Sequence, residues 1–120
     1  NTAPYLQNAY VRIRSIFRRG EVEADPQAAI QISVPAERIL AIKLLQYAET
    51  VPVVLDDFRP NILANYLYEL ANTYHSFYEA CTVLKAEPAV RASRLLLSEL
   101  TARTLAHGLS LLGICCPEKM

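Results

Sequence analysis

The stretch NILANYLYELANTYHSFYEACTVL, residues 61–84, contains neither glycine nor proline. Its apolar side chains recur at steps of three and four residues, the spacing that places them on one face of an α-helix. The members of this face are Leu63, Tyr66, Leu67, Leu70, Tyr74, Phe77 and Cys81. The sequence therefore predicts one long amphipathic helix, and the usual role of so many rings is to pack in a core.

Three helices are predicted before this stretch. The first spans about residues 4–18 and ends before a glycine. The second covers residues 35–49 and begins at Pro35, whose fixed φ angle suits a first helical turn. Thr50 precedes a Val-Pro pair and is interpreted as the N-cap of a short helix over residues 51–58.

A last helix is predicted over residues 88–112, with Gly113 as its C-terminal stop. Residues 20–34 have weak periodicity and an internal proline, which is typical of a loop. No segment has the alternation of a strand. We therefore predict an all-α fold, an antiparallel-like bundle of four main helices plus a short connecting helix, in which residues 1–120 form one domain.

Composition limits where the chain is expected to act. No window has the roughly 18 uncharged apolar residues of a membrane span, and the N-terminus lacks the features of a signal peptide. We expect a cytoplasmic protein with no membrane partner. Three cysteines, two of them adjacent, suit neither a disulfide framework nor a metal site, which favours reduced thiols.

The sequence contains no pattern that indicates catalysis. Its three glycines form no phosphate-binding loop, and no nucleophile and base occur at a familiar spacing. His75 and His107 lie on different predicted helices without cysteines at ligand spacing, so we predict no metal site. Asp56 and Asp57 are adjacent, and adjacent side chains on a helix point in different directions. We expect no catalytic residue and no cofactor in this chain.

Charge is unevenly distributed although the net charge is zero. Residues 1–20 contain four arginines and no acid, residues 21–60 contain seven acids and three bases, and residues 61–120 contain five of each. On the first helix a polar stripe follows the helical period through Asn8, Arg12, Ser15 and Arg19. Such a stripe can contact an RNA strand or simply face solvent, and the pattern alone favours neither.

Three blocks of the sequence resemble the C-terminal domain of arginyl-tRNA synthetases. These blocks are YLQNAYVRIRSIFR, RPNILANYLYELANTYHSFYEACTVLKAE and RASRLLLSELTARTLAHGLSLLGICCPEKM, and together they cover most of the chain. The resemblance is to the DALR-type anticodon-binding domain of class I synthetases, although the Asp-Ala-Leu-Arg tetrapeptide itself is absent. It implies a C-terminal fragment of a larger synthetase, in which an upstream catalytic domain of the same chain binds ATP and Mg and arginylates tRNA(Arg).

The resemblance also implies a set of RNA-binding residues. Tyr78 matches a family tyrosine that contacts an anticodon base, Arg12 matches an arginine that faces the anticodon, and Met120 matches a terminal methionine. Asn8 stands where the family commonly has a tyrosine, so stacking there should be weaker or replaced by amide hydrogen bonds. The alternatives are core packing for Tyr78, a solvated charge for Arg12 and a frayed tail for Met120.

Two function classes follow from these patterns. The first is a module that recognises the anticodon stem-loop of tRNA(Arg) and positions the tRNA for an active site elsewhere. The second is a helical protein-interaction module in which exposed aromatic side chains dock another protein, and the zero net charge suits it. RNA binding through arginines weakens as salt is added because counterions are released, so the salt dependence of binding separates the two.

Overall fold

The computed structural model describes residues 3–57 and 59–113, and within them the chain folds into five α-helices. The helices are α1 (Ala3–Gly20), α2 (Pro35–Leu45), α3 (Tyr47–Asp57), α4 (Pro60–Ala80) and α5 (Pro88–Leu111). No residue in these described ranges forms a strand. The predicted all-α class is confirmed.

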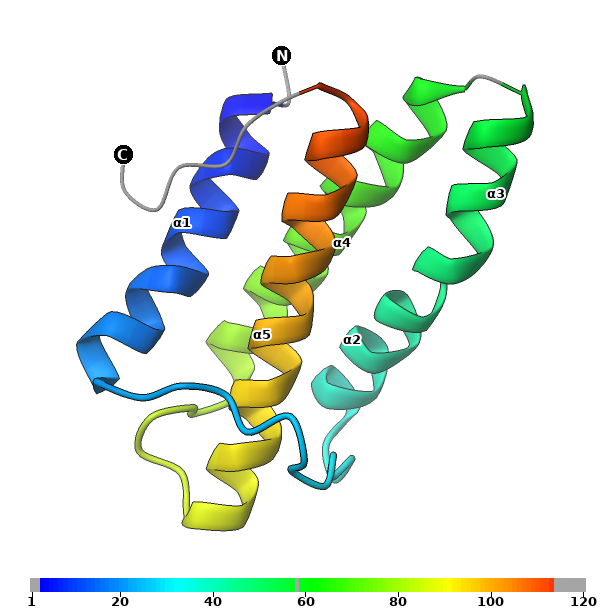
Figure 1. Ribbon diagram of the computed structural model, residues 1–120. Helices are drawn as coiled ribbons and strands as arrows, with labels where there is room; N and C mark the ends of the chain where they lie inside the picture. Colours follow the sequence, from blue (N-terminus) through cyan, green and yellow to red (C-terminus); the bar gives the residue numbers. More distant parts are fainter. Residues whose placement is uncertain (1–2, 58, 114–120) are drawn as a thin grey trace.

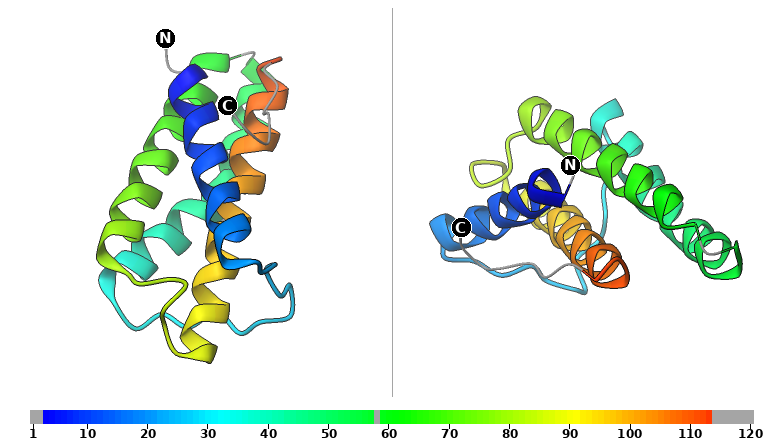
Figure 2. Two further views of the ribbon diagram at one scale, coloured as in Figure 1. Left: turned by 90° about the vertical axis from the view of Figure 1, so that its left-hand side faces the viewer. Right: turned by 90° about the horizontal axis from the view of Figure 1, so that it is seen from above.

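The helices form an antiparallel bundle. In Figure 1, α1 and α4 run down the page, whereas α5 and the consecutive pair α2 and α3 run up it. Helix α1 packs against α4 and α5, α2 packs against the same two helices from the other side, and α3 packs mainly on α4. Seen from above, α3 lies at the end of the bundle far from α1 (Figure 2). Helix α1 and helix α3, on opposite sides of the bundle, therefore have separate surfaces.

The core follows the predicted face of α4. All seven apolar residues of that face are buried, and Leu63, Leu67, Leu70 and Phe77 have no exposed surface. Gly108 of α5 lies directly against this face, because a Cβ atom built there would be 2.6 Å from Leu67 Cδ2. Glycine therefore allows α4 and α5 to approach closely at this level.

The predicted boundary between the second and third helices is wrong. Helix α2 ends at Leu45, four residues early, and α3 begins at Tyr47, so Thr50 lies inside α3. The Thr50 hydroxyl donates to the Gln46 carbonyl at 3.0 Å instead of capping a helix. This back-bond to residue i−4 is the alternative open to threonine within a helix. Pro52 therefore lies within the helix that it was expected to introduce.

The long helix also ends earlier than predicted, at Ala80 instead of residue 84. Cys81 adopts an extended conformation, and the following Val83 is still buried, with 3% of its surface exposed. The Arg94 guanidinium donates from α5 to the carbonyl of Thr82 at 2.7 Å. Tertiary contacts thus satisfy the backbone beyond the helix, which periodicity cannot reveal.

The predicted loop is confirmed, and it crosses the lower front of α5 on its way from α1 to α2 (Figure 1). The Gln31 backbone N–H donates to the buried Ser93 hydroxyl at 2.8 Å. At its end, Glu37 Oε1 accepts from the Ser33 and Val34 N–H groups, while Glu37 Oε2 accepts from Arg94 Nε at 2.9 Å. The loop is therefore fixed to α5 at two points.

Candidate nucleic-acid interface

The polar stripe predicted on α1 lines a groove between α1 and α4 with a volume of about 380 Å³. The polar and aromatic residues that line it are Tyr5, Asn8, Arg12, Ser15 and Arg19 from α1, and Tyr74, His75 and Tyr78 from α4. The structure thus brings together three of the four predicted site residues, Asn8, Arg12 and Tyr78. The fourth, Met120, lies outside the described residues.

Tyr78 is on the surface of the bundle, with 37% of its area exposed, whereas the neighbouring Phe77 is fully buried. The core-packing alternative therefore applies to Phe77. The Tyr78 ring stacks on the buried Tyr74 ring, with centroids 6.2 Å apart and planes 18° from parallel. The Tyr74 hydroxyl lies 2.8 Å from that of Ser98 on α5, and burial raises the pKa of Tyr74. An exposed ring thus rests on one that is held in the core.

Arg12 and Arg19 provide the positive charge of the groove. Both are exposed, and no acidic residue lines this groove among the described residues. The Nη2 atom of Arg19 donates to the Tyr78 hydroxyl at 3.5 Å, so a guanidinium from α1 lies beside the ring from α4. A planar guanidinium can bind a phosphate or a base edge through several N–H groups. The geometry therefore suits an anionic ligand with a flat ring.

Tyr5 also lines the groove, although it was not predicted from the sequence. Its ring contacts that of Tyr68 at a centroid distance of 5.3 Å, and its hydroxyl donates to Asn72 Oδ1 on α4. The spacing did contain a signal, because Tyr5 lies three residues before Asn8 and therefore on the same helix face. Aromatic surface from α1 thus adds to that from α4 in the same groove.

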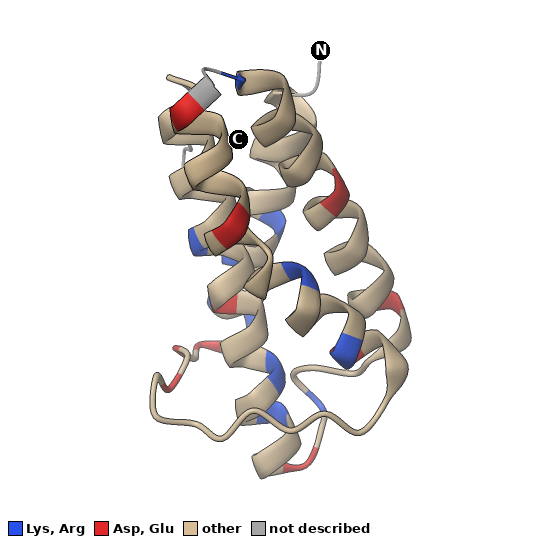
Figure 3. Ribbon diagram, turned by 90° about the vertical axis from the view of Figure 1, so that its right-hand side faces the viewer, with Lys and Arg blue, Asp and Glu red and all other residues tan. Residues whose placement is uncertain are grey.

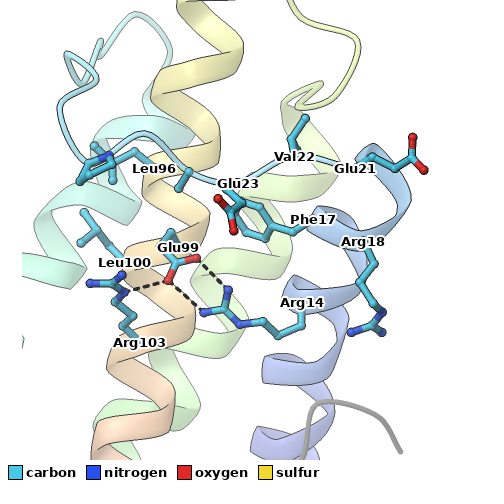
Figure 4. A pocket seen from close by; sticks show the side chains of 12 residues that line it. Arg14, Phe17, Arg18, Glu21, Val22, Glu23, Leu96, Glu99, Leu100 and Arg103 are labelled. Atoms are coloured by element: carbon cyan, nitrogen blue, oxygen red, sulfur yellow. Dashed lines mark hydrogen bonds and ion pairs between the residues drawn. The ribbon is translucent and has the colours of Figure 1, made fainter.

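Arg14 faces away from this groove, because it lies two positions after Arg12 and so on another face of α1. Its guanidinium forms a two-point ion pair with Glu99 of α5, at 2.7 and 3.1 Å, and Arg103 binds the same carboxylate at 2.8 Å (Figure 4). The hydrogen bond from Arg14 lowers the pKa of Glu99. The partner of Arg14 is thus another helix of the bundle.

A larger groove of about 890 Å³ lies on this second side of α1, between α1, α5 and residues 21–26. Three arginines and three glutamates line it, namely Arg14, Arg18, Arg103, Glu21, Glu23 and Glu99. These charges cancel, so this groove lacks the excess positive charge that attracts a polyanion. The smaller groove, with arginines and no lining acid, is the better RNA-binding candidate.

The part of the chain that the structure describes has neither a membrane-spanning helix nor a group of metal-ligating side chains. No helix there is long and apolar enough to cross a membrane. Across residues 3–57 and 59–113, no three histidine, cysteine, aspartate or glutamate side chains are grouped so that they could hold a metal ion.

The sequence and the fold were also compared with known proteins. Residues 6–120 match the family model of the DALR anticodon binding domain. Arginine–tRNA ligases from Haemophilus ducreyi and Mannheimia succiniciproducens are 53% and 54% identical to the whole chain, which covers 22% and 21% of their lengths. The chain thus spans about a fifth of these curated relatives.

Solved structures with a similar fold are also arginyl-tRNA synthetases. The arginyl-tRNA synthetase of Thermus thermophilus aligns with 98% of this chain at a TM-score of 0.85 and 37% identity, and the alignment covers 21% of that protein. The arginyl-tRNA synthetase of Plasmodium falciparum aligns with 97% of this chain at a TM-score of 0.85 and 29% identity, again over 21% of its length. With nearly all of its residues matched by the family model, this chain belongs to the DALR anticodon-binding domain family.

Proposed function

We propose that this chain binds the anticodon stem-loop of tRNA(Arg) and is the C-terminal part of a longer arginyl-tRNA synthetase. The observation that carries the proposal is the α1–α4 groove, where Asn8, Arg12 and Tyr78 come together without a lining acid. The family and the names of the relatives support the choice of RNA. The domain would hold the tRNA so that its acceptor end reaches a distant active site.

The groove suits an unstacked loop. Single-stranded bases are commonly recognised by stacking on aromatic rings and by hydrogen bonds to their edges. The exposed face of Tyr78 offers such a ring, and stacking a base there would contribute about 1–3 kcal/mol. Arg12 and Arg19 would bind the phosphates or base edges that flank this base. Met120 is proposed as a further contact from the end of the chain.

The chemical step is assigned to another part of the synthetase. The α1–α4 groove contains groups that stack and form hydrogen bonds, which suit RNA recognition. We expect ATP and Mg to bind in the catalytic domain upstream. The complete enzyme would charge tRNA for protein synthesis. Its predicted location is therefore the cytoplasm.

Fluorescence titration with two RNAs tests the proposal. The first is an arginine-tRNA anticodon stem-loop, and the second is the same stem-loop with its anticodon bases replaced. We expect tighter binding of the native loop at two salt concentrations, with weaker binding of both RNAs at the higher one. Equal affinity for the two loops would refute anticodon recognition by this chain.

The exposed apolar residues of α2 and α3 favour a second activity, which is protein binding. Leu45 is 74% exposed, Leu55 is 63% exposed and Ile39 is 58% exposed. Figure 3 shows uncharged residues on α2 and α3 between their charged positions. We propose that this surface contacts the remainder of the synthetase, which would replace water over these side chains.

This second proposal has its own test. The probe is the Haemophilus ducreyi arginine–tRNA ligase shortened by its C-terminal fifth, titrated with the present chain. Leu45→Glu should abolish binding of this probe, because a charge would be buried in an apolar contact, and should leave RNA binding unchanged. Equal binding of the probe by wild type and Leu45→Glu would refute the assignment of this surface.

A further inference from the structure

We propose that His75 is a further RNA-contacting residue of the α1–α4 groove, where its ring accepts a hydrogen bond from the nucleotide next to the one stacked on Tyr78. The inference rests on the proposed function, because it takes RNA as the ligand of this groove. It adds a contact of a different chemical kind from those of the arginines and the tyrosine.

The position of His75 places its ring beside Tyr78. It precedes Tyr78 by three residues on α4, so the two side chains share a helix face and are separated by about 4.5 Å along the helix axis. Both residues line the groove, and His75 is exposed. A strand that stacks one base on Tyr78 would therefore bring an adjacent nucleotide to His75.

The contact between His75 and Glu79 determines what the ring can offer. His75 Nε2 lies 3.2 Å from Glu79 Oε1, one helical turn later. An ionised carboxylate has no proton to donate, so Nε2 carries the hydrogen that binds Glu79. In the neutral ring the other nitrogen, Nδ1, is then a hydrogen-bond acceptor. Glu79 thus orients the ring and, when the ring is neutral, fixes its tautomer.

An acceptor at His75 complements the two arginines of this groove. The arginines only donate, and so they recognise phosphates and base acceptors. An acceptor at Nδ1 recognises the opposite pattern, which is the amino group of a base or the hydroxyl of a ribose. His75 would therefore distinguish a nucleotide that presents a donor from one that does not.

Substitution of the two histidines tests the proposal with a matched control. His75→Ala should weaken binding of the arginine-tRNA anticodon stem-loop roughly three- to tenfold, as expected for one neutral hydrogen bond. His75→Gln retains an acceptor oxygen and should recover part of this loss. His107→Ala is the control, because His107 lies on α5 with its Nδ1 2.6 Å from the Tyr47 hydroxyl, away from the groove. Its binding should equal that of the wild type.

The salt dependence identifies the kind of contact. Because a neutral acceptor releases no counterion, His75→Ala should leave the slope of log affinity against log salt unchanged. Unchanged affinity in His75→Ala would overturn the proposal, and so would a shallower slope, because it would indicate a cationic contact to phosphate. Failure of the proposed function gives a different result, since the wild-type chain would then bind native and replaced loops equally.

Discussion

The buried carboxylate of Glu37 makes the stability of the fold depend on acidity. Glu37 is fully buried at the start of α2 and accepts hydrogen bonds from Ser33, Val34 and Arg94. Burial alone raises the pKa of a carboxyl group, but the Arg94 hydrogen bond and the two backbone N–H groups outweigh it. Together they lower the pKa of Glu37 from 4.5 to about 2. The ionised form is thus preferred in the folded chain.

The size and sign of the effect follow from this difference in pKa. A group whose folded pKa is depressed stabilises the fold above its unfolded pKa, and the contribution is lost as the pH falls through the folded value. For Glu37 the full contribution is present above about pH 4.5 and is lost near pH 2. At about 1.4 kcal/mol for each tenfold change in the protonation equilibrium, the loss is about 3 kcal/mol.

Urea unfolding followed by circular dichroism between pH 6 and pH 2 measures this loss. The wild type should lose about 3 kcal/mol more than Glu37→Gln, whose amide does not titrate, because the other carboxyl groups contribute equally to both. Glu79→Gln, a substitution of an exposed glutamate, should follow the wild-type curve. Ser33→Ala removes the hydroxyl that donates to Glu37 Oε1 at 3.1 Å but retains the backbone donor, so it should keep most of the acid sensitivity. Parallel curves for the wild type and Glu37→Gln would refute the reasoning.

Three further substitutions test the proposed roles of single side chains. Tyr78→Ala should weaken stem-loop binding by about 1–3 kcal/mol with unchanged helicity, measured by titration and circular dichroism, and an equal loss of folding and binding would contradict a stacking role. Arg12→Ala should lower the slope of log affinity against log salt by roughly 0.7–0.9 for each lost phosphate contact, whereas an unchanged slope would exclude such a contact. Glu99→Gln should destabilise the fold by about 1.5–3 kcal/mol in urea, because Arg14 and Arg103 both bind this carboxylate, and unchanged stability would show that the pairs contribute nothing.

Local periodicity was enough to predict the elements and the core. The face of α4 could be assigned from the sequence because its seven apolar residues keep a helical spacing that any buried helix requires. The errors lie where tertiary contacts replace local ones. Thr50 matched an N-cap pattern, yet its hydroxyl bonds within α3, and the carbonyl of Thr82 is satisfied by Arg94 from α5 instead of by another turn of helix.

Helix geometry predicts which side chains near each other in the sequence belong to the candidate site, because it directs them to different faces of a helix. Phe77 and Tyr78 are adjacent, and the turn of about 100° between them takes one ring into the core and the other into the groove. Arg14 comes two positions after Arg12, which places the two side chains on different sides of α1. The groove itself could not be predicted, because its second wall comes from α4, far along the chain. From the sequence alone His75 was an isolated histidine, and only the packing of α1 against α4 places it in a groove.

The structure also explains how a chain without net charge can have a locally basic groove. Interactions between exposed charges are largely screened beyond about 10 Å at 0.1 M salt, so the charge near the groove matters more than the total. Arg14 contributes little to the field outside, because its charge is paired with Glu99, whereas Arg12 and Arg19 line a groove without a lining acid. All seven acids of residues 21–60 belong to the loop, α2 and α3, and α2 and α3 make no extensive contact with α1. The local excess on one side of α1 is therefore the charge that a polyanion would meet.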